Sequence, residues 1–486
     1  MVLFIFLTPL GVLIAFLSNP GSIHEVRQAD SLSFALNYLH FDFNFFHPQN
    51  FNLTSEDGKC ASEFPIFYYF AAIIALIGIK TSLVLKLLHG LTFFGAIYFL
   101  WKKTTQYFNN NYFVSSTTVL ILLTSTVLLY YSNNLLPDIA ALGLTIAGIS
   151  QFYFLKEESK SRLMRALFLM TLASMIKITY GIYPLAFLGT RLFISLKNKN
   201  EIISWIKQCL LFILPVASWW LFVKLYNEGA GNNYYFNTFL PIWESSSEQR
   251  KITLDHVLHY WRNSYYPEIT QILFALSLLG LVFFTRQIHF IKKGFIWISL
   301  IGVICYVVLF FEKFRDHDYY FLVIVPFVYF TIIEFIHQVQ NGFYFKYKNI
   351  ILSFALLAIG ISSYSYVYKK LPQRIAQPEF LITKPGPEYN RTLFAVSALK
   401  KIDPTHSLKI LIVGDSTMNN TLVKFERKGW QFPIIPVSEN DQIPLQTIAQ
   451  SDVVFLTKDD CSTQEMFSEK LRLEYRESAP GLWLRK

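Results

Sequence analysis

The sequence predicts an all-α polytopic membrane protein with a small α/β domain at its C-terminal end. Of its 486 residues, 53% are hydrophobic and 17% aromatic, whereas only 16% are charged. A soluble domain carries about 25% charged residues, so an ordinary soluble enzyme is excluded. Apolar segments of helical length follow one another as far as residue 367, and beyond residue 369 proline, charge and short β-like runs replace them.

The apolar segments predict about eleven membrane-spanning helices. The first, Val2 to Ser18, is followed by a poor cleavage sequence, which favours a helix over a removable signal peptide. The further segments lie at 64–79, 82–101, 113–131, 138–155, 164–180, 181–195, 206–224, 269–285, 295–311, 319–336 and 349–367. We expect all of them to span except 64–79, whose Pro65 start and aromatic residues suit a helix in the outer interface.

Basic residues set the orientation. The formal net charge is +10, but the lysines and arginines cluster between apolar segments, which indicates orientation signals rather than a nucleic-acid surface. With 64–79 at the interface, every basic loop falls on one side, which the positive-inside rule identifies as cytoplasmic. The residues concerned are Lys102, Lys103, Lys156, Lys160, Arg162, Arg165, Arg191, Lys197, Lys199, Lys207, Arg286, Lys292, Lys293, Lys346 and Lys348. The loop 19–64, the loop near 225–267, the turn 312–318 and the tail from 369 then lie outside.

The tail has the pattern of a separate domain. A β-like run from Lys409 to Asp415, a helix from Ser416 and a second run from Asp452 to Thr457 predict strand, helix and strand. We therefore divide the chain into a membrane domain, 1–368, and an outer α/β domain, 369–486, with a linker at 369–387.

The first outer loop, with its continuation to about residue 81, holds the densest set of polar residues. Arg27 and Asp30 are three residues apart and share a face if the segment is helical, with Asn37 two turns beyond Asp30. That face suits catalysis, although an ion pair on a solvated helix has the same spacing. Glu63 precedes Phe64 and could either contribute to a site or favour the N-terminus of a helix.

Further candidates lie at the predicted outer ends of helices. Asp138 suits an N-cap or a site. In the turn from Glu312 to Tyr320, Arg315 could fork to a phosphate and His317 could ligate a metal, or the turn could be solvated. Lys177 could snorkel to the interface or neutralise an anionic lipid head group.

At these residues the sequence resembles lipid-linked-sugar glycosyltransferases of the GT-C superfold, in the protein-mannosyltransferase and aminoarabinose-transferase group (glycosyltransferase family 39-like). The resemblance covers nearly the whole chain. It departs from relatives at Val26 and Ser31, where they often have an aromatic residue and a threonine. The motifs that carry it are Arg27-Gln28-Ala29-Asp30, Glu63-Phe64-Pro65, His317-Asp318-Tyr319-Tyr320 and Glu426-Arg427-Lys428-Gly429-Trp430.

The resemblance implies an enzyme, a hexosyl- or pentosyltransferase that moves a sugar from a polyprenyl phosphate to an acceptor hydroxyl with inversion. Asp30 would be the base, and Glu63 would orient the acceptor or stabilise the donor sugar. The remaining residues would bind the donor and its phosphate: Arg27, Lys177, Arg315, His317, Asp138 and Tyr320. A divalent cation, Mg²⁺ or Mn²⁺, is left open, because one carboxylate with distant partners makes a poor divalent site.

The implied partners are the polyprenyl-phosphate donor, the lipid bilayer and a glycolipid, glycan or protein acceptor, without nucleic acid. The implied location is a bacterial inner membrane, with the active site and tail on the periplasmic face. The alternative is a transporter or flippase of lipid-linked saccharides. Transporters place ionisable groups near the midplane, whereas most of those found here lie at predicted outer helix ends, which favours the enzyme.

Overall fold

The computed structural model describes residues 23–155, 159–196, 198–232, 239–284, 288–342, 347–376, 387–433, 445–458 and 465–486. The chain forms two compact units. The first, here called the helical unit, comprises Met1–Leu17, Lys86–Leu221 and Asn237–Ile375. The second, the loop–tail unit, comprises Ser18–Leu85, Phe222–Phe236 and Ala376–Lys486. The predicted helix at 2–18 lies outside the described residues.

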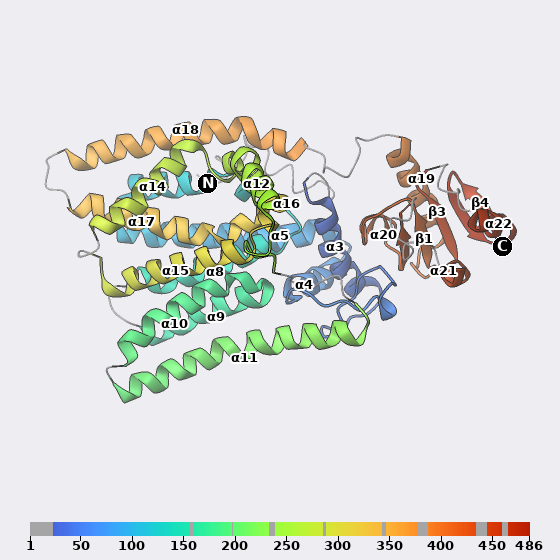
Figure 1. Ribbon diagram of the computed structural model, residues 1–486, viewed down its shortest axis with the longest axis horizontal. Coiled ribbons are helices and arrows are strands. Elements are labelled where there is room, and N and C mark those ends of the chain that lie inside the picture. The colour runs from blue at the N-terminus through green and yellow to red at the C-terminus, as the bar shows by residue number, and fades with distance from the viewer. Residues whose placement is uncertain are drawn as a thin grey trace. The chain divides into compact units, whose positions relative to one another are not determined.

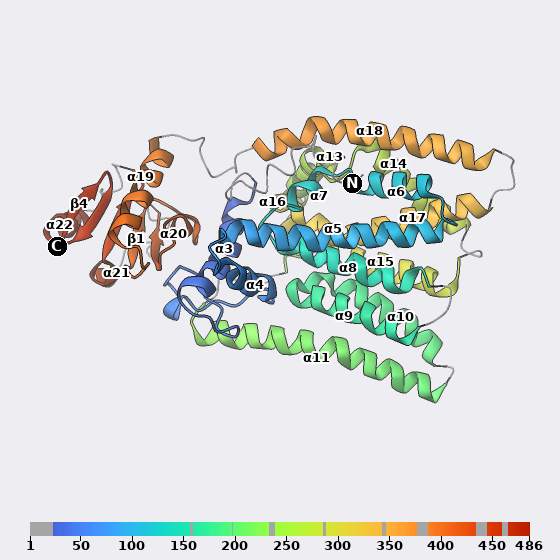
Figure 2. The ribbon, with the colours of Figure 1, turned by 180° about the vertical axis from the view of Figure 1, so that it is seen from behind.

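The helical unit is built from long and short helices that run roughly side by side (Figures 1 and 2). In chain order the helices that contribute to it are α5 (Thr81–Tyr107), α6 (Tyr112–Leu123), α7 (Thr126–Tyr131), α8 (Asp138–Tyr153), α9 (Lys160–Ile176), η3 (Ile178–Gly181), α10 (Ile182–Ser195), α11 (Lys199–Gly229), α12 (Ser247–Asp255), the π-helical η4 (His256–Trp261), α13 (Arg262–Tyr265), α14 (Glu268–Phe283), α15 (Phe290–Leu309), α16 (Lys313–Asp316), η5 (Asp318–Val323), α17 (Val325–Gly342) and α18 (Lys348–Ala376).

Among the described residues, four helices are long and apolar enough to cross a membrane: α5, α11, α15 and α18. A fifth span is possible where α12–α13 and α14 meet, since that pair passes the same test together but is bent by 97°. Several other predicted spans are helical but short. The 16 residues of α8, for instance, extend only about 24 Å at 1.5 Å per residue, against a hydrocarbon core of about 30 Å. The number eleven therefore stays a prediction.

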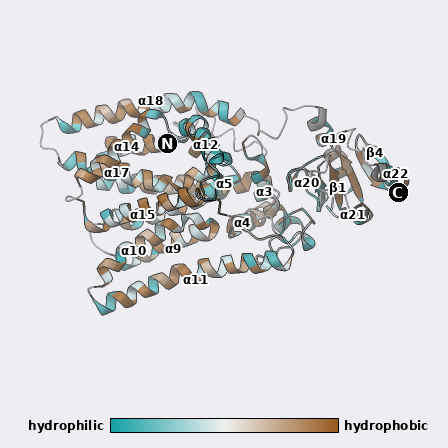
Figure 3. Ribbon diagram, in the orientation of Figure 1, coloured by the Kyte–Doolittle hydropathy of each residue, from teal (hydrophilic) through white to brown (hydrophobic). Residues whose placement is uncertain are grey.

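The long helices expose apolar side chains. Only 17% of the most apolar window of α11 and 22% of that of α18 is buried inside the protein, against 50% for α5. Stretches of α11, α15 and α18 are coloured as hydrophobic in Figure 3. A helix satisfies its own backbone hydrogen bonds, so apolar outer faces of this kind suit contact with lipid.

Helix α8 lies at the centre of the helical unit and is held there by close packing. A Cβ at Gly148 would approach the Ala166 carbonyl oxygen of α9 to 2.9 Å, and one at Gly143 would approach the Phe93 Cα of α5 to 2.8 Å. Small residues allow the backbones of membrane helices to approach in this way. This packing fixes the position of Asp138, the first residue of α8.

The loop–tail unit combines the first outer loop with the tail. The loop carries α3 (Glu25–His40), η2 (Glu56–Gly58) and α4 (Ile66–Ala75). The tail carries α19 (Pro387–Ile402), β1 (Ile410–Val413), α20 (Asn420–Phe425), β2 (Gly429–Phe432), α21 (Leu445–Gln450), β3 (Val453–Leu456), α22 (Glu465–Glu474), β4 (Tyr475–Ala479) and β5 (Leu482–Arg485). All five strands that the structure describes form one sheet, in the order β2-β1-β3-β5-β4.

The small C-terminal sheet predicted from the sequence is confirmed. The two expected runs form β1 and β3, which pair in parallel, and α20 and β2 follow β1 in the chain. The helix begins later than expected, at Asn420, because Asp415 first accepts hydrogen bonds from Thr417 N (2.8 Å) and Thr421 Oγ1 (2.5 Å). Side-chain hydrogen bonds of this kind favour a turn over a helix.

The first loop adds to the edge of this sheet. Gly429 N donates to the Phe51 carbonyl at 2.9 Å, and Leu53 N donates to the Gly429 carbonyl at 2.7 Å. Gly429 has to be glycine, since a Cβ there would come within 1.8 Å of the Ile410 carbonyl oxygen. The loop therefore covers the β2 edge, which would otherwise present unpaired backbone groups.

The α4 segment is a helix of 10 residues, about 15 Å long, which is too short to span a bilayer. That length agrees with the prediction of a non-spanning helix. Its position at the outer interface stays a prediction, as does the domain boundary between 368 and 369.

Candidate functional site

The first outer loop places Arg27 and Asp30 on one helix. Helix α3 begins at Glu25, and Arg27 and Asp30 follow one turn apart. Asp30 is only 2% exposed. The helix is therefore not the solvated loop helix that the alternative interpretation requires.

Glu63 joins this group through an ion pair with Arg27. The Arg27 Nη2 contacts the Glu63 Oε1, and the side chains of Arg27 and Glu63 are 19% and 5% exposed. The second carboxylate oxygen of Glu63 accepts a hydrogen bond of 2.6 Å from Ser62 Oγ. Glu63 lies outside α4, whose N-cap is Pro65, and its contacts are those of a buried ion pair rather than of a helix-terminal charge.

Asn227 fixes the backbone that leads to Glu63. Its amide accepts from Ala61 N at 2.7 Å and donates to the Ala61 carbonyl at 2.8 Å. Asn227 is fully buried, and it comes from the segment 222–236, far away in the sequence. Sequence reasoning missed this residue because nothing in its local pattern links it to the first loop.

Helix α4 packs against the side of α3 that also carries Arg27, since Ser31 and Phe34 follow Arg27 by four and seven residues. The rings of Phe34 and Tyr68 stack with centroids 5.4 Å apart. The Tyr68 hydroxyl donates to Ser31 Oγ at 3.4 Å. These contacts set the rotation of α3 about its axis and therefore the direction of the Arg27 and Asp30 side chains.

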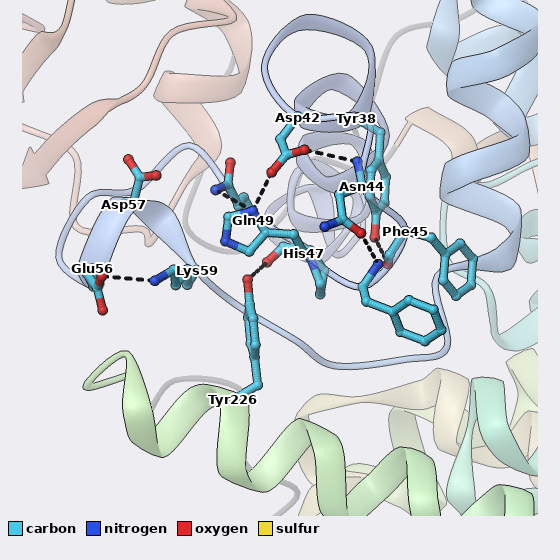
Figure 4. Close-up of polar contacts among 12 residues, drawn as sticks. Tyr38, Asp42, Asn44, Phe45, His47, Gln49, Glu56, Asp57, Lys59 and Tyr226 are labelled. Carbon is cyan, nitrogen blue, oxygen red and sulfur yellow. Dashed lines mark hydrogen bonds and ion pairs between the residues drawn. The ribbon is translucent and has the colours of Figure 1, made fainter.

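A polar network orders the loop between α3 and Glu63 (Figure 4). Asp42 contacts His47 Nδ1 and accepts from Asn44 N at 3.0 Å. The hydrogen bond from His47 is the main cause that lowers the pKa of Asp42. Tyr226 donates to the Pro48 carbonyl at 3.1 Å, and Lys59 pairs with Glu56 at 2.9 Å (Figure 4). These contacts form a scaffold, since each one joins loop residues to one another or to residues 222–236.

The helical unit contains a second polar group, centred on Lys177. Its Nζ lies 3.0 Å from the Asp138 Oδ1, and the two side chains are 11% and 1% exposed. Asp138 is the first residue of α8 and Pro137 is the N-cap, so Asp138 is not a capping residue. Lys177 follows the last residue of α9 and is turned towards Asp138 inside the unit rather than outwards to an interface.

Aromatic rings lie beside Lys177, and His317 lies beside those rings. Its ammonium lies 5.2 Å from the ring centroid of Tyr319 and 5.5 Å from that of Tyr320, within the range of a cation–π interaction. The rings of His317 and Tyr320 stack with their centroids 5.8 Å apart. The structure thus brings together Lys177, Asp138, His317 and Tyr320 of the predicted site residues.

Sequence reasoning missed a buried triad beside η5. Asp318 is fully buried, accepts from the Tyr131 hydroxyl at 2.7 Å and pairs with Arg374. The Arg374 guanidinium also lies 4.9 Å from the Tyr130 ring. A basic residue near the end of an apolar segment was the available signal, because such residues need a partner.

The guanidinium of Arg315 is engaged by the next residue in the sequence. It makes a bidentate pair with its neighbour Asp316, with Nη2 to Oδ2 at 2.8 Å and Nε to Oδ1 at 3.0 Å. Its side chain is 35% exposed. This surface pair occupies the fork that would otherwise bind a phosphate.

Two carboxylates of these groups are paired with side-chain cations. The two oxygens of Glu63 are engaged by Arg27 and Ser62, and Asp138 is paired with Lys177. A metal ion at either carboxylate would have to compete with the cation already there. A divalent cation, Mg²⁺ or Mn²⁺, therefore stays a prediction.

The fold is that of a polytopic helical membrane protein whose first long loop packs with a C-terminal sheet in one unit. Solved structures of ArnT from Cupriavidus metallidurans have a similar overall fold. The structure bound to undecaprenyl phosphate has a TM-score of 0.62 and 10% identity, and the match covers 99% of this chain and 97% of that one. The apo structure has a TM-score of 0.63 at 10% identity, with 100% and 97% covered.

This likeness confirms, at the level of the fold, the resemblance that the sequence motifs indicated. No family model matches the sequence. No curated protein matches it either.

Proposed function

We propose that this protein is a membrane glycosyltransferase that transfers a sugar from a polyprenyl phosphate to an acceptor hydroxyl. The observation that carries the proposal is the likeness to ArnT, an aminoarabinose transferase, over nearly the whole length of both chains. One of those ArnT structures holds undecaprenyl phosphate. The buried group of Arg27, Asp30 and Glu63 in the first loop supplies residues suited to the chemistry.

Asp30 is the proposed general base. The acceptor oxygen attacks the anomeric carbon, its proton passes to the Asp30 carboxylate, and the bond from the anomeric carbon to the lipid phosphate oxygen breaks. The lipid phosphate leaves with the electron pair, and direct displacement inverts the anomeric centre. Burial to 2% exposure supports this role, because exclusion of bulk water favours direct proton transfer from a bound acceptor.

Glu63 is proposed to orient the acceptor or the donor sugar. Its carboxylate is held by Arg27, and carboxylate oxygens can accept hydrogen bonds from sugar hydroxyls. Ser62 and Asn227 restrict its position. Restricted geometry of this kind is what positioning of a reacting group requires.

The lipid phosphate is proposed to bind in the helical unit at Lys177. An ammonium group stabilises the charge that develops on the leaving phosphate, and Asp138 would release Lys177 to it. Tyr320 supports this site through its contact with Lys177, and His317 lies beside Tyr320. Arg315 is a weaker candidate, because Asp316 occupies its guanidinium.

The proposed setting is the outer face of a bacterial inner membrane, with the loop–tail unit on the periplasmic side. The distribution of basic loops in the sequence supports that orientation. The proposed acceptor is a glycolipid, a glycan or a protein, each of which offers a hydroxyl.

The test is sugar transfer by purified protein in liposomes, supplied with a panel of polyprenyl-phosphate sugars and native lipid extract. Asp30→Asn keeps the shape of the side chain and removes the base, so turnover should fall by about 10² to 10⁴-fold. Asp42→Asn is the matched control, since Asp42 lies in the same loop but contacts only its scaffold. Undiminished transfer by Asp30→Asn would remove Asp30 from the mechanism, and lack of transfer from every donor would count against the enzyme itself.

A further inference from the structure

Three potential metal ligands meet in the loop–tail unit. His40 is the last residue of α3, His406 lies between α19 and β1, and Glu426 follows the last residue of α20. One ring nitrogen of each histidine and one carboxylate oxygen of Glu426 all lie within 4.8 Å of one another. The three residues come from segments far apart in sequence, so the cluster is a product of the tertiary structure.

The distances are close to those of a coordination sphere. Glu426 Oε2 lies 3.8 Å from His40 Nε2 and 4.0 Å from His406 Nδ1. Zinc bonds of about 2.0–2.1 Å at tetrahedral angles place ligand atoms about 3.4 Å apart. The Glu426 side chain is 39% exposed and has the freedom to close that difference of about half an ångström. The imidazole rings, stacked at 4.4 Å, have to turn towards a shared ion.

The backbone supports a specific role for two of these residues. His406 and Glu426 have φ values of 61° and 53°, in the left-handed region. That region is unfavourable for a residue other than glycine. Glu426 occupies the helix-end position that glycine most often takes. Strained backbone at residues with ligating side chains is a feature of ligand-binding positions.

A basic residue contacts the cluster. The Arg427 guanidinium contacts His406 Nδ1 and would have to withdraw from that nitrogen for an ion to bind there. Asp403 balances the charge of Arg427, with Arg427 Nε 3.0 Å from Asp403 Oδ2.

We propose that His40, His406 and Glu426 bind one divalent transition-metal ion of the zinc type, with water completing the coordination. Two histidines and a carboxylate are a zinc-binding set, and a carboxylate with two imidazoles suits zinc better than magnesium. The site does not depend on the proposed glycosyltransferase function.

The role of the ion would be structural, since it would join the end of α3 to the tail. The same helix is tied to the tail near its start, where Lys424 pairs with Glu25 at 3.2 Å. The residues from Lys424 to Glu426 thus contact both ends of the helix that carries Asp30. The metal would complete the fixation of that helix.

The experiment is metal binding by the full chain, purified in detergent without a polyhistidine tag and stripped with a chelator. Titration with Zn²⁺ in competition with a chromophoric chelator should give one site per chain, and Co²⁺ should give the absorption of a four-coordinate ion. Glu426→Gln and His40→Ala should each weaken Zn²⁺ binding by about 10-fold or more. His259→Ala is the matched control, because His259 pairs with Asp255 outside the cluster.

X-ray absorption at the zinc edge of the wild-type protein provides a second measurement that needs no variant. The expected result is coordination by two imidazoles with oxygen ligands. Binding that Glu426→Gln leaves unchanged, or a zinc spectrum without imidazole, would overturn the proposal. Because neither measurement uses sugar transfer, failure of this site and failure of the proposed function can be told apart.

Discussion

Replacing Arg27 by methionine removes the charge that balances Glu63 but keeps most of the length of the side chain. Glu63 is the more deeply buried partner, at 5% exposure against 19% for Arg27. An ionised carboxylate left in that position loses its partner and cannot regain full hydration. Removing one member of a buried ion pair costs about 3–5 kcal/mol, and the partial exposure of Arg27 places Arg27→Met near the lower value.

Replacing Glu63 by glutamine should lower the free energy of unfolding by less than Arg27→Met does. In Glu63→Gln the charge left behind is that of Arg27, which has access to water through its exposed fraction. We therefore expect Arg27→Met to destabilise the protein more than Glu63→Gln. The double variant should recover a large part of the loss, since it buries no unpaired charge.

The assay is a double-mutant cycle from thermal or denaturant unfolding of the purified protein in one detergent. The expected interaction energy is about 2 kcal/mol. Three results would refute the reasoning: additive effects of the two changes, a larger loss in Glu63→Gln, or no loss in either. Each would mean that Glu63 is hydrated or protonated rather than held as an ion by Arg27.

Three other predictions follow from single positions. Gly429→Ala should disrupt the loop–tail unit and expose it to limited proteolysis, because its Cβ would reach within 1.8 Å of a β1 carbonyl, whereas Gly95→Ala meets nothing within 4 Å and should be tolerated. Since the folded pKa of His40 is lowered to about 4, its contribution to stability is present above its unfolded pKa of about 6.5. That contribution is lost as the pH falls towards 4. The free energy of unfolding of the metal-free wild type should therefore fall more steeply over this pH range than that of His40→Gln. The control variant, His259→Gln, should follow the wild type. Lys177→Gln should lower kcat/KM for the proposed polyprenyl-phosphate donor by about 10-fold or more, measured by initial rates, and an unchanged value would place the phosphate elsewhere.

Local patterns in the sequence account for the helices and strands. The apolar segments predicted helices because a chain in lipid must satisfy its backbone hydrogen bonds internally. Within the part of the chain that the structure describes, four of those helices have the length to span. The spacing of Arg27 and Asp30 predicted that they share one helical face, because the period of the helix is fixed. The runs that became β1 and β3 carried their own β-like signal.

The contacts between residues far apart in the chain were not predicted. The sequence singled out Arg27 and Glu63 but did not predict their ion pair, and it did not reveal that Asn227 holds the backbone beside Glu63. Nor did it predict the pairing of Asp318 with Arg374. A residue's own neighbours in sequence cannot specify such contacts, since they depend on how helices far apart in the chain are packed.

The sequence by itself determined a polytopic helical protein with an α/β tail and the resemblance that its motifs express. Only the tertiary structure decided that the first loop and the tail form one unit, that Gly429 joins them, and that His40, His406 and Glu426 meet. The physical reason is that helices and strands follow from the periodicity and hydrogen bonding of short segments, whereas buried charge pairs and ligand clusters follow from long-range packing.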